Sequence, residues 1–543
     1  MTAAKDHRPV LPAALWHADP DPGYSDSTIG DALTRAASQW RDRTALVDGV
    51  VGEHARRWTF EELLEDSVRV AHALLRWFSP GERLAVWAGN SPEWIQLEFG
   101  AALAGLTLVT VNPAFRQAEL SYVLEQSRAA GIVVQPRYRS AELLPMANAA
   151  RDGTQVREVI SLDDWDGLRA DESSARDGLP HVAPKDPAQI QYTSGTTGRP
   201  KGALLSHRGL VANGRRYATV IGAHPDDVWV NPMPLFHTAG CGLVTLGALQ
   251  TGGCHVIPAG FDADLMLDLF EAERGTLMLS VPTMLIRMLE RQADRPRDVS
   301  SWRLTTLGGA PVPIDLVLRA QRDLGVGVGI GYGQTEASPY ITHTAGGEQD
   351  TETLATVGRP LPGTEVKIIA PGSGEVAGVG ELGEICTRSV CVMTEYFDDA
   401  AATAEAIDAD GWLHTGDLGT MDASGSVAVE GRLKDMIIRG GENIFPREIE
   451  DVLYTHPGIS LVTVIGLPDA EWGETVAAFV VAADGPRLTG DELDAFCRDR
   501  LASYKVPRSW HFRSELPQTA SGKIQKVALR EEHLVGGSRS PSA

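Results

Sequence analysis

Cysteine is scarce in this chain of 543 residues, which contains only five. Their number is odd and they are widely separated, so the sequence indicates neither a disulfide framework nor a zinc site. The first ten residues, MTAAKDHRPV, lack the apolar core of a signal peptide. We therefore expect a cytoplasmic protein with reduced thiols. The five cysteines are Cys241, Cys254, Cys386, Cys391 and Cys497.

Long apolar runs and an excess of positive charge are also missing. The longest uncharged, apolar-looking run, Phe99 to Val111, falls short of the roughly 20 residues that a membrane-spanning helix needs. The chain has 72 Asp and Glu against 49 Lys and Arg, a formal net charge of −23. A nucleic acid or an anionic membrane would require a concentrated basic face. We expect no nucleic-acid partner and no integral membrane segment.

The chain is long enough for a large domain and a smaller one, because single cores stop growing at about 250–300 residues. Residues 26 to 190 alternate between helix-like and strand-like patterns, and the alternation continues further on. It predicts βαβ units, and so an α/β fold with a largely parallel sheet. The clearest predicted elements are helices opening at Ile29 and covering Trp94–Ala104 and Met284–Arg291, and strands at Arg83–Trp87 and Asp227–Val230.

Two changes of texture follow in the C-terminal half. Near residue 357, short strands between Gly and Pro turns predict a small antiparallel β-barrel or sheet. After Gly431 the pattern is compact α+β. We place an N-terminal domain at 1–431, a small α+β domain at 432–534 and a disordered tail at 535–543. The elements predicted in the small domain are helices at Pro446–Tyr454 and Asp491–Leu501 and strands at Leu461–Ile465 and Ala477–Val481.

The stretch YTSGTTGRPKG, Tyr192 to Gly202, has the parts of an anion-binding loop. Glycines let backbone N–H groups converge, hydroxyls add donors, and Lys201 adds a charge. The stretch fails the Walker A pattern at Pro200 and Gly202. The glycine run Gly325–Gly333 likewise lacks the third glycine of a dinucleotide fingerprint. Taken alone, a loop of this composition is more readily explained as a flexible surface loop, but it follows a predicted strand that ends at Gln191.

Further stretches carry specific chemistry. In GYGQTE, Tyr332 can stack on a purine, Thr335 can donate to a phosphate, and Glu336 is a hard oxygen ligand for Mg²⁺. In HTGDLG, Asp417 can accept hydrogen bonds from both ribose hydroxyls, or it can form an ordinary Asp turn. The other stretches are PLFHTAG (234–240), LGGAPVP (307–313), GRLKDMIIRGGENIFPREIE (431–450) and PQTASGKIQK (517–526).

In this order and spacing, the stretches resemble the signatures of the adenylate-forming (AMP-binding) superfamily, in its acyl-CoA synthetase branch. The resemblance extends from Ile190 to Lys526, and residues 112 to 127 also look like acyl-CoA synthetases. It implies an ATP-dependent ligase that activates a carboxylic acid as an acyl-adenylate. The enzyme then forms a CoA thioester and releases AMP and pyrophosphate. ATP, Mg²⁺ and coenzyme A are the implied cofactors and co-substrates.

The resemblance also implies roles for individual residues. Lys434 is implied as the interdomain hinge, Gly440 and Gly441 as the lining for coenzyme A, and Glu336 as the metal ligand. The implied catalytic residues are Thr193, His237, Glu336 and Lys523. The implied acyl-pocket residues are His237, Thr238, Gly240, Gly308 and Gly309. The implied ATP- and AMP-binding residues are Thr193, Ser194, Gly195, Thr196, Thr197, Gly198, Lys201, Gly309, Ala310, Pro311, Gly331, Tyr332, Gly333, Gln334, Thr335, Asp417, Arg432 and Lys523.

The sequence does not fully define the acid that is activated or the thiol that accepts the acyl group. Amino-acid-activating relatives carry Phe-Asp where this chain has Phe236-His237, and burying an ammonium without a counter-charge costs several kcal/mol. An apolar acid, in particular a fatty acid, is therefore favoured over an amino acid. Small residues near the implied pocket would admit a long chain, and aryl acids stay possible. They are Ala239, Gly240, Gly242, Gly308 and Gly309.

Two rival functions are an acyl-AMP ligase that loads an acyl carrier protein and a catalytically silent nucleotide-binding module. Relatives that load a carrier protein with fatty acids typically carry an inserted segment in the large domain. No extra block interrupts residues 336–414, which disfavours the first alternative. A catalytically silent module would not need Lys523, the implied catalytic lysine, which disfavours the second. The oligomeric state is open. Glu448 and Glu450 are expected to be solvated charges on a helix face, and little consequence is expected from Lys526, which replaces an arginine common in relatives.

Overall fold

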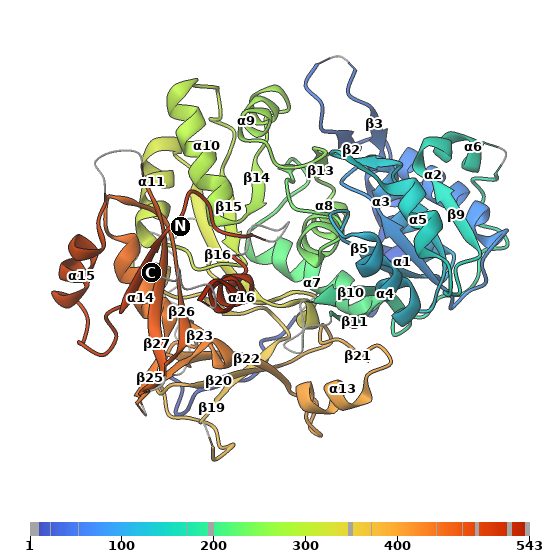
Figure 1. Ribbon diagram of the computed structural model, residues 1–543. Helices are drawn as coiled ribbons and strands as arrows, with labels where there is room; N and C mark the ends of the chain where they lie inside the picture. Colours follow the sequence, from blue (N-terminus) through green and yellow to red (C-terminus); the bar gives the residue numbers. More distant parts are fainter. Residues whose placement is uncertain are drawn as a thin grey trace.

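The computed structural model describes residues 10–21, 23–52, 54–170, 172–193, 200–345, 351–370, 372–440, 442–469, 471–483, 488–518 and 524–537. Within these residues the chain builds two large, mostly parallel sheets, a five-stranded antiparallel sheet and a separate C-terminal α+β unit. Figure 1 shows the C-terminal helices α14 and α15, in orange and red, on the side opposite to the blue helices of the N-terminal half. The predicted α/β class is confirmed.

The first large sheet has seven strands in the order β21-β11-β10-β5-β4-β6-β9. Its central pairs are parallel, whereas β10, β11 and β21 pair antiparallel. The central strands are buried throughout, as parallel strands covered on both faces must be. The strands are β21 (Glu395–Tyr396), β11 (Lys201–Ser206), β10 (Pro187–Thr193), β5 (Thr107–Val111), β4 (Arg83–Trp87), β6 (Ala129–Val134) and β9 (Glu158–Ser161).

The second large sheet has nine strands, in the order β18-β17-β16-β15-β14-β12-β13-β2-β3. The pairs from β16 through to β2 are parallel, and the two edges are antiparallel. The strands are β18 (Arg359–Pro360), β17 (Tyr340–His343), β16 (Gly327–Gly333), β15 (Leu304–Gly308), β14 (Leu277–Ser280), β12 (Val228–Val230), β13 (Cys254–Ile257), β2 (Thr44–Asp48) and β3 (Arg57–Thr59).

Helices begin where the sequence provides caps. The Thr28 hydroxyl accepts from the Asp31 N–H, and the Asp31 carboxylate accepts from the Thr28 N–H, a capping box that starts α1. The helices are α1 (Ile29–Trp40), α2 (Phe60–Leu75), α3 (Pro92–Leu103), α4 (Gln117–Gln126), α5 (Leu143–Ala150), α6 (Trp165–Arg169), α7 (His207–Val220), α8 (Leu246–Thr251), α9 (Ala263–Ala272), α10 (Pro282–Asp294), α11 (Ile314–Leu324), α12 (Thr351–Leu354) and α13 (Ala400–Ala406). No helix among the described residues is long and apolar enough to cross a membrane.

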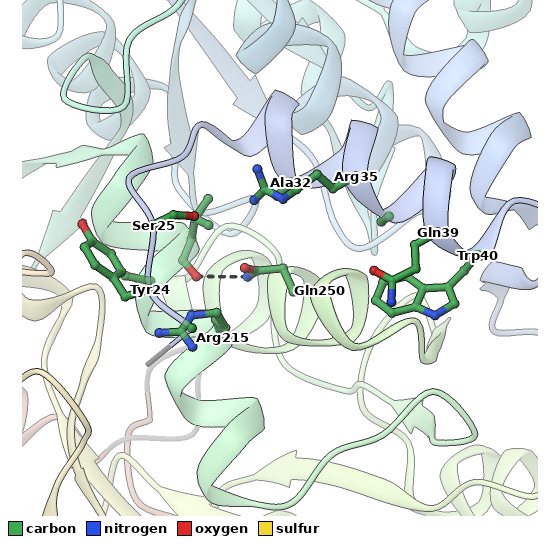
Figure 2. Close-up of a pocket in the computed structure, with 12 residues that line it drawn as sticks. Tyr24, Ser25, Ala32, Arg35, Gln39, Trp40, Arg215 and Gln250 are labelled. Carbon is green, nitrogen blue, oxygen red and sulfur yellow. Dashed lines mark hydrogen bonds between the residues drawn. The ribbon is translucent and has the colours of Figure 1, made fainter. Parts of the chain in front are cut away.

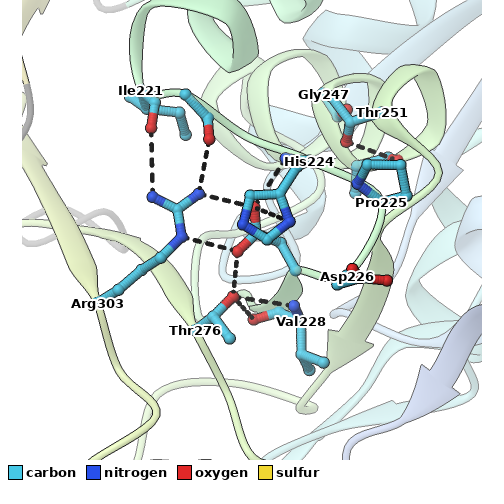
Figure 3. Close-up of polar contacts among 12 residues, drawn as sticks. Ile221, His224, Pro225, Asp226, Val228, Gly247, Thr251, Thr276 and Arg303 are labelled. Carbon is cyan, nitrogen blue, oxygen red and sulfur yellow. Dashed lines mark hydrogen bonds and ion pairs between the residues drawn. The ribbon is translucent and has the colours of Figure 1, made fainter. Parts of the chain in front are cut away.

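A buried carboxylate fixes the amino ends of three strands in the nine-stranded sheet (Figure 3). Asp227, just before β12, accepts from Arg303 Nη2 at 2.7 Å and from Thr276 Oγ1 at 2.7 Å. Thr276 and Arg303 directly precede β14 and β15. Burial acts to raise the pKa of Asp227, but the hydrogen bonds from Arg303 and Thr276 outweigh it and lower that pKa below its ordinary value. One carboxylate therefore joins the starts of the three strands.

The antiparallel sheet lies where the small barrel or sheet was predicted. Its order is β1-β19-β20-β22-β23. A separate two-stranded hairpin joins β7 (Arg137–Tyr138) and β8 (Ala141–Glu142). The five strands are β1 (Leu15–Trp16), β19 (Glu365–Ile369), β20 (Gly383–Arg388), β22 (Leu413–Met421) and β23 (Val427–Arg432).

The C-terminal unit has its own buried core. Helix α14 covers the residues predicted for it, whereas the two predicted central strands are longer than expected because they form one continuous hairpin. Helix α16 includes the first three residues of the predicted tail. The elements are β24 (Ile437–Arg439), β25 (Glu442–Ile444), α14 (Pro446–Tyr454), β26 (Ile459–Asp469), β27 (Gly473–Ala482), α15 (Gly490–Arg498), β28 (Ser509–Phe512) and α16 (Lys526–Gly537).

The expectation that Glu450 is solvated is wrong. Its side chain is only 7% exposed and its Oε1 accepts from the Val464 N–H at 2.8 Å and from Lys526 Nζ at 2.8 Å. Lys526 therefore ties α16 to α14, a role that its sequence position did not reveal. Glu448 is 40% exposed and pairs with Lys505 at 2.6 Å. The two glutamates differ in exposure because Glu450 contacts β26, whereas Glu448 pairs with Lys505.

We expect Glu450→Ala to destabilise the C-terminal unit by about 3–5 kcal/mol, because it leaves Lys526 without its partner and removes a buried acceptor. Glu448→Ala is the matched control and is expected to cost about 0–1 kcal/mol, as exposed pairs do. Chemical denaturation followed by tryptophan fluorescence measures both. Equal losses in the two variants would contradict the distinction.

Candidate active site

Three sheets meet where β10 and β16 end. β10 ends at Thr193, and β16 ends at Gly333 beside β15, with Gly308 and Gly331 in register. The hairpin of β22 and β23 approaches the same place, because Tyr332 on β16 hydrogen-bonds to Asp417 on β22. Ligands of open α/β sheets bind beyond the carboxyl ends of parallel strands. The predicted residues from these strands therefore lie at one edge, near the ends of β10 and β16 (strands labelled in Figure 1).

Glu336 lies at the centre of this edge, in a short 3₁₀ turn after β16. It is 8% exposed. Its Oε1 accepts from the Tyr396 hydroxyl at 2.6 Å and from Thr193 Oγ1 at 3.4 Å. Its backbone carbonyl accepts from the Met393 N–H at 2.7 Å. Among the described residues none donates to Oε2, so one carboxylate oxygen stays available for a hard cation.

Tyr396 was missed by the sequence analysis. It comes from β21, which pairs with β11, and Lys201 at the start of β11 lies with Nζ 5.1 Å from the Tyr396 ring centroid. Burial, followed by the charge of Glu336, raises the pKa of Tyr396, so its hydroxyl remains a proton donor. β21 is only two residues long and carries no motif that could have marked it. The structure thus connects Lys201 to Glu336 through one tyrosine.

A second polar group forms on the antiparallel sheet. Asp417 and Arg432 are register partners, and Arg432 Nε lies 3.1 Å from Asp417 Oδ1. The Tyr332 hydroxyl donates to Asp417 Oδ2 at 2.8 Å. Burial and the Asp417 charge raise the pKa of Tyr332 well above its usual value. The side chain of Asp417 is 7% exposed, whereas that of Arg432 is 45% exposed. This carboxylate is therefore fixed in position, with a cation at its solvent side.

Backbone packing is tight between these two groups. The backbone N–H of Gln334 donates to the Pro339 carbonyl at 3.0 Å. A Cβ atom added to Gly333 would overlap that same carbonyl oxygen. Thr335 is buried, whereas Gly309, Ala310 and Pro311 are exposed in the loop after β15. Gly309 has φ +75°, the left-handed conformation that glycine adopts without strain.

The predicted acyl-binding segment leads into a π-helix, Ala239–Thr245. The carbonyl of His237 accepts from the N–H groups of Gly240 and Cys241, at 2.9 and 3.2 Å. Thr238 Oγ1 is buried and has no hydrogen-bond partner among the described residues. A Cβ atom at Gly240 would overlap the Pro234 carbonyl. π-helical turns are rare and are frequently found at functional sites.

The predicted hinge and coenzyme A residues lie after β23. Lys434 is exposed in the 3₁₀ turn Leu433–Asp435, and desolvation with the nearby Arg432 charge lowers its pKa. Gly440 follows β24 with φ +58°, and its N–H donates to the Trp472 carbonyl at 2.8 Å. The remaining predicted site residues lie outside the described residues. They are Ser194, Gly195, Thr196, Thr197, Gly198, Gly441 and Lys523.

A cavity of about 160 Å³ lies between α1, α7 and α8 (Figure 2). Figure 2 places Arg35 and Gln39 of α1 on one wall and Gln250 on another. Gln250 Nε2 donates to the Val211 carbonyl at 3.0 Å, and Arg215 pairs with Asp21. None of the predicted site residues lines this cavity. It therefore adds nothing to the candidate active site.

Two family models match the chain. The model described as AMP-binding enzyme matches residues 33–397, and the model of the AMP-binding enzyme C-terminal domain matches residues 448–523. The human mitochondrial medium-chain acyl-CoA ligase ACSF2 is 34% identical over 94% of this chain and 88% of its own length. A feruloyl-CoA synthase from Amycolatopsis is 39% identical over 87% of this chain and 93% of its own length.

Solved structures agree with these matches. ATP-bound MatB from Rhodopseudomonas palustris aligns with a TM-score of 0.84 and 29% identity, over 93% of this chain and 99% of that one. The anthranilate CoA ligase AuaEII with anthranoyl-AMP aligns with a TM-score of 0.86 and 25% identity, over 94% of this chain and 98% of that one. Similarity therefore covers both the large domain and the C-terminal unit.

Gly333→Ala is expected to weaken AMP binding and to lower the free energy of unfolding by about 1–3 kcal/mol, because the new methyl group overlaps backbone rather than a flexible side chain. Gly167→Ala is the control, since an added Cβ there meets nothing within 4 Å. Isothermal titration with AMP and chemical denaturation measure the two effects. A Gly333→Ala protein that matches the Gly167→Ala protein in both would contradict the tight packing described.

Proposed function

The chain belongs to the family of AMP-binding enzymes and is an AMP-forming acyl-CoA synthetase, and on this premise we propose which residues carry out each step and which acid is activated. One observation carries the proposal. Two groups of polar side chains lie near the ends of β10 and β16. The first contains Glu336, Thr193, Lys201 and Tyr396. The second contains Tyr332, Asp417 and Arg432. A buried carboxylate with hydroxyl and ammonium groups near it, and a second carboxylate paired with an arginine, support roles in binding a cation, phosphates and a ribose.

In the first half-reaction, an oxygen of the substrate carboxylate forms a bond to the α-phosphorus of ATP. The bond from that phosphorus to the bridging oxygen breaks, and pyrophosphate leaves with the electron pair. Catalysis of this type depends mainly on positioning and on stabilising phosphoryl charge. We assign donation to the phosphates to Thr193 and Lys201, together with Ser194, Thr196 and Thr197. Asp417 receives the ribose hydroxyls, and Lys523 stabilises charge at the α-phosphate.

Glu336 fits the magnesium role by its chemistry. Its carboxylate is buried, one oxygen is fixed by Tyr396 and the other has no donor among the described residues. Mg²⁺, when bound, neutralises charge on phosphate oxygens. The contribution of this chain is to hold Oε1 so that Oε2 points to one place. Tyr396 therefore acts as a positioning residue for Glu336.

We propose that the acid is apolar, either a medium-chain aliphatic acid or an aryl acid. Around the segment that carries His237, the side chains from the π-helix and from Tyr217, Trp229 and Tyr340 form a buried apolar cluster. The chain neighbours of His237 are Phe236 and Thr238, so the sequence places no Asp or Glu next to it to balance a substrate ammonium. The relatives named for medium-chain and feruloyl substrates support both acid classes. A reduced, cytoplasmic setting is proposed for the enzyme, whose five cysteines are all free.

In the second half-reaction, the thiol of coenzyme A attacks the acyl carbonyl, and AMP leaves. We propose that the C-terminal unit rotates about Lys434 between the two steps, which withdraws Lys523 and brings Gly440 and Gly441 to the pantetheine arm. The exposed position of Lys434, in the 3₁₀ turn that follows β23 and precedes the C-terminal unit, supports a hinge there.

The proposed function is tested by release of pyrophosphate over a panel of acids from short aliphatic through long-chain to aryl, with ATP and Mg²⁺. We expect turnover that requires an apolar acid, and thioester formation with coenzyme A. A holo acyl carrier protein is the control acceptor. Pyrophosphate release that ignores the acid, or product formed only on the carrier protein, would contradict the proposal.

Lys523→Ala and Gly440→Ala are expected to separate the two half-reactions. Lys523→Ala should lower adenylation by about 100-fold or more, as loss of a transition-state donor does, and largely spare thioester formation from supplied acyl-AMP. Gly440→Ala should do the reverse, because its Cβ would lie 2.7 Å from the Trp472 ring beside the proposed coenzyme A path. Rapid-quench assays of each half-reaction give the answer. If both variants are folded and each slows adenylation and thioester formation to the same extent, the proposed assignment of the two residues to separate half-reactions is wrong.

Tyr396→Phe is expected to raise the Mg²⁺ concentration needed for half-maximal pyrophosphate release by about 10–100-fold, because partners behind a metal ligand contribute that much. The variant keeps the ring against Lys201 and loses only the hydroxyl. Binding of Mn²⁺ to the complex with a non-hydrolysable ATP analogue, followed by electron paramagnetic resonance, should weaken in parallel. Unchanged metal dependence and Mn²⁺ affinity would show that Tyr396 does not position Glu336.

A further inference from the structure

Alternate glycines of β16 make room for aromatic side chains of β17. Gly329, Gly331 and Gly333 point to one face of the strand, as residues two apart must. A Cβ atom at Gly329 would lie 2.7 Å from the His343 ring, and one at Gly331 would overlap the Tyr340 ring. The glycine run that failed as a dinucleotide fingerprint therefore leaves space that the Tyr340 and His343 rings fill, with the two ring planes tilted by 47°.

The Tyr340 ring also reaches the neighbouring strand. Gly308 is the register partner of Gly331, and a Cβ atom added to Gly308 would lie 2.6 Å from the Tyr340 hydroxyl oxygen. Gly308 is one of the residues proposed to border the acyl group. The phenol of Tyr340 thus occupies the space that two glycines leave open at the carboxyl ends of β15 and β16.

Tyr340 is held rigidly in this position. Its N–H donates to Asn213 Oδ1 at 3.1 Å, and its carbonyl accepts from Asn213 Nδ2 at 2.8 Å. Its ring packs edge-on against Tyr217 with centroids 5.4 Å apart, and lies 5.8 Å from His343. Tyr340 is 7% exposed. A side chain fixed by backbone bonds and by two aromatic neighbours cannot swing aside for a longer ligand without losing these contacts.

The same apolar cluster joins Tyr340 to the segment proposed to meet the acid. It contains Ala239, Leu243 and Val244 of the π-helix together with Tyr340 and Tyr217. The π-helix begins directly after His237 and Thr238. An acyl chain that enters beside these residues toward Gly308 would therefore meet the Tyr340 side chain.

We infer that Tyr340 is a specificity-determining residue that limits how far the acyl chain extends and so selects medium-chain or flat aryl acids over long-chain acids. The inference rests on the proposed function and narrows it. The small residues in the sequence suggested a pocket that admits a long acyl chain. The space beside Gly308 is instead filled by an aromatic side chain from another strand.

Tyr340→Ala tests the inference. Removing the ring should raise the ratio of kcat/KM for a sixteen-carbon acid to that for an eight-carbon acid by about 10–200-fold, the range that pocket size commands in discrimination by methylene groups. Tyr340→Phe is the matched control, since it keeps the ring and should leave the chain-length profile as in the wild type. Binding of non-reactive acyl-sulfamoyl adenosines with eight and sixteen carbons, measured by calorimetry, should change in the same direction.

The outcomes separate this inference from the proposed function. If the wild-type enzyme activates no acid of the panel, the proposed function fails. If the wild type is active and Tyr340→Ala binds AMP normally yet keeps the wild-type preference in both turnover and analogue binding, the inference fails. A wild type that already prefers the sixteen-carbon acid would also overturn it. A gain for the long acid in Tyr340→Ala but not in Tyr340→Phe establishes it.

Discussion

The carboxylate of Glu336 is the interaction on which the active-site geometry depends. It is buried at the end of β16, yet its partners come from the other large sheet, Thr193 on β10 and Tyr396 on β21. A buried polar group that lost these hydrogen bonds would destabilise the folded state. The two sheets are therefore linked at the place where phosphate chemistry needs them, and Lys201 is held there through its contact with the Tyr396 ring.

Glycine placement gives the site its shape. The period-2 glycines of β16 remove side chains where β17 lays its aromatic rings, and Gly333 lets the backbone pass the Pro339 carbonyl. The same strand then delivers Tyr332 to Asp417 and Glu336 to Tyr396. One strand thus borders both the proposed acyl group and the proposed nucleotide. This economy explains why a glycine-rich strand lies at the centre of a large sheet, where glycine alone would weaken it.

Much of this could be predicted from the sequence, because local patterns survive in the fold. The alternation of elements gave the α/β class, Pro446 at a helix start fixed the beginning of α14, and the short motifs named Glu336, Asp417 and Arg432. Tyr396 and Tyr340 could not be found in this way. Each acts through contacts with residues distant in sequence or on a neighbouring strand, and neither belongs to a recognisable pattern. Glu450 was misjudged because its polar side chain gives no sign of the buried partners supplied by β26 and α16.

The most direct test of the proposed mechanism measures whether an oxygen atom of the acid is transferred to AMP. The acid is supplied with ¹⁸O in its carboxylate, and the AMP released with coenzyme A and ATP is examined by mass spectrometry for the wild type and for Glu336→Gln. The account predicts one ¹⁸O atom in AMP from the wild type, and AMP formation slowed by roughly 100-fold in Glu336→Gln with AMP binding retained. Unlabelled AMP, label in pyrophosphate, or an undiminished rate in Glu336→Gln would contradict it.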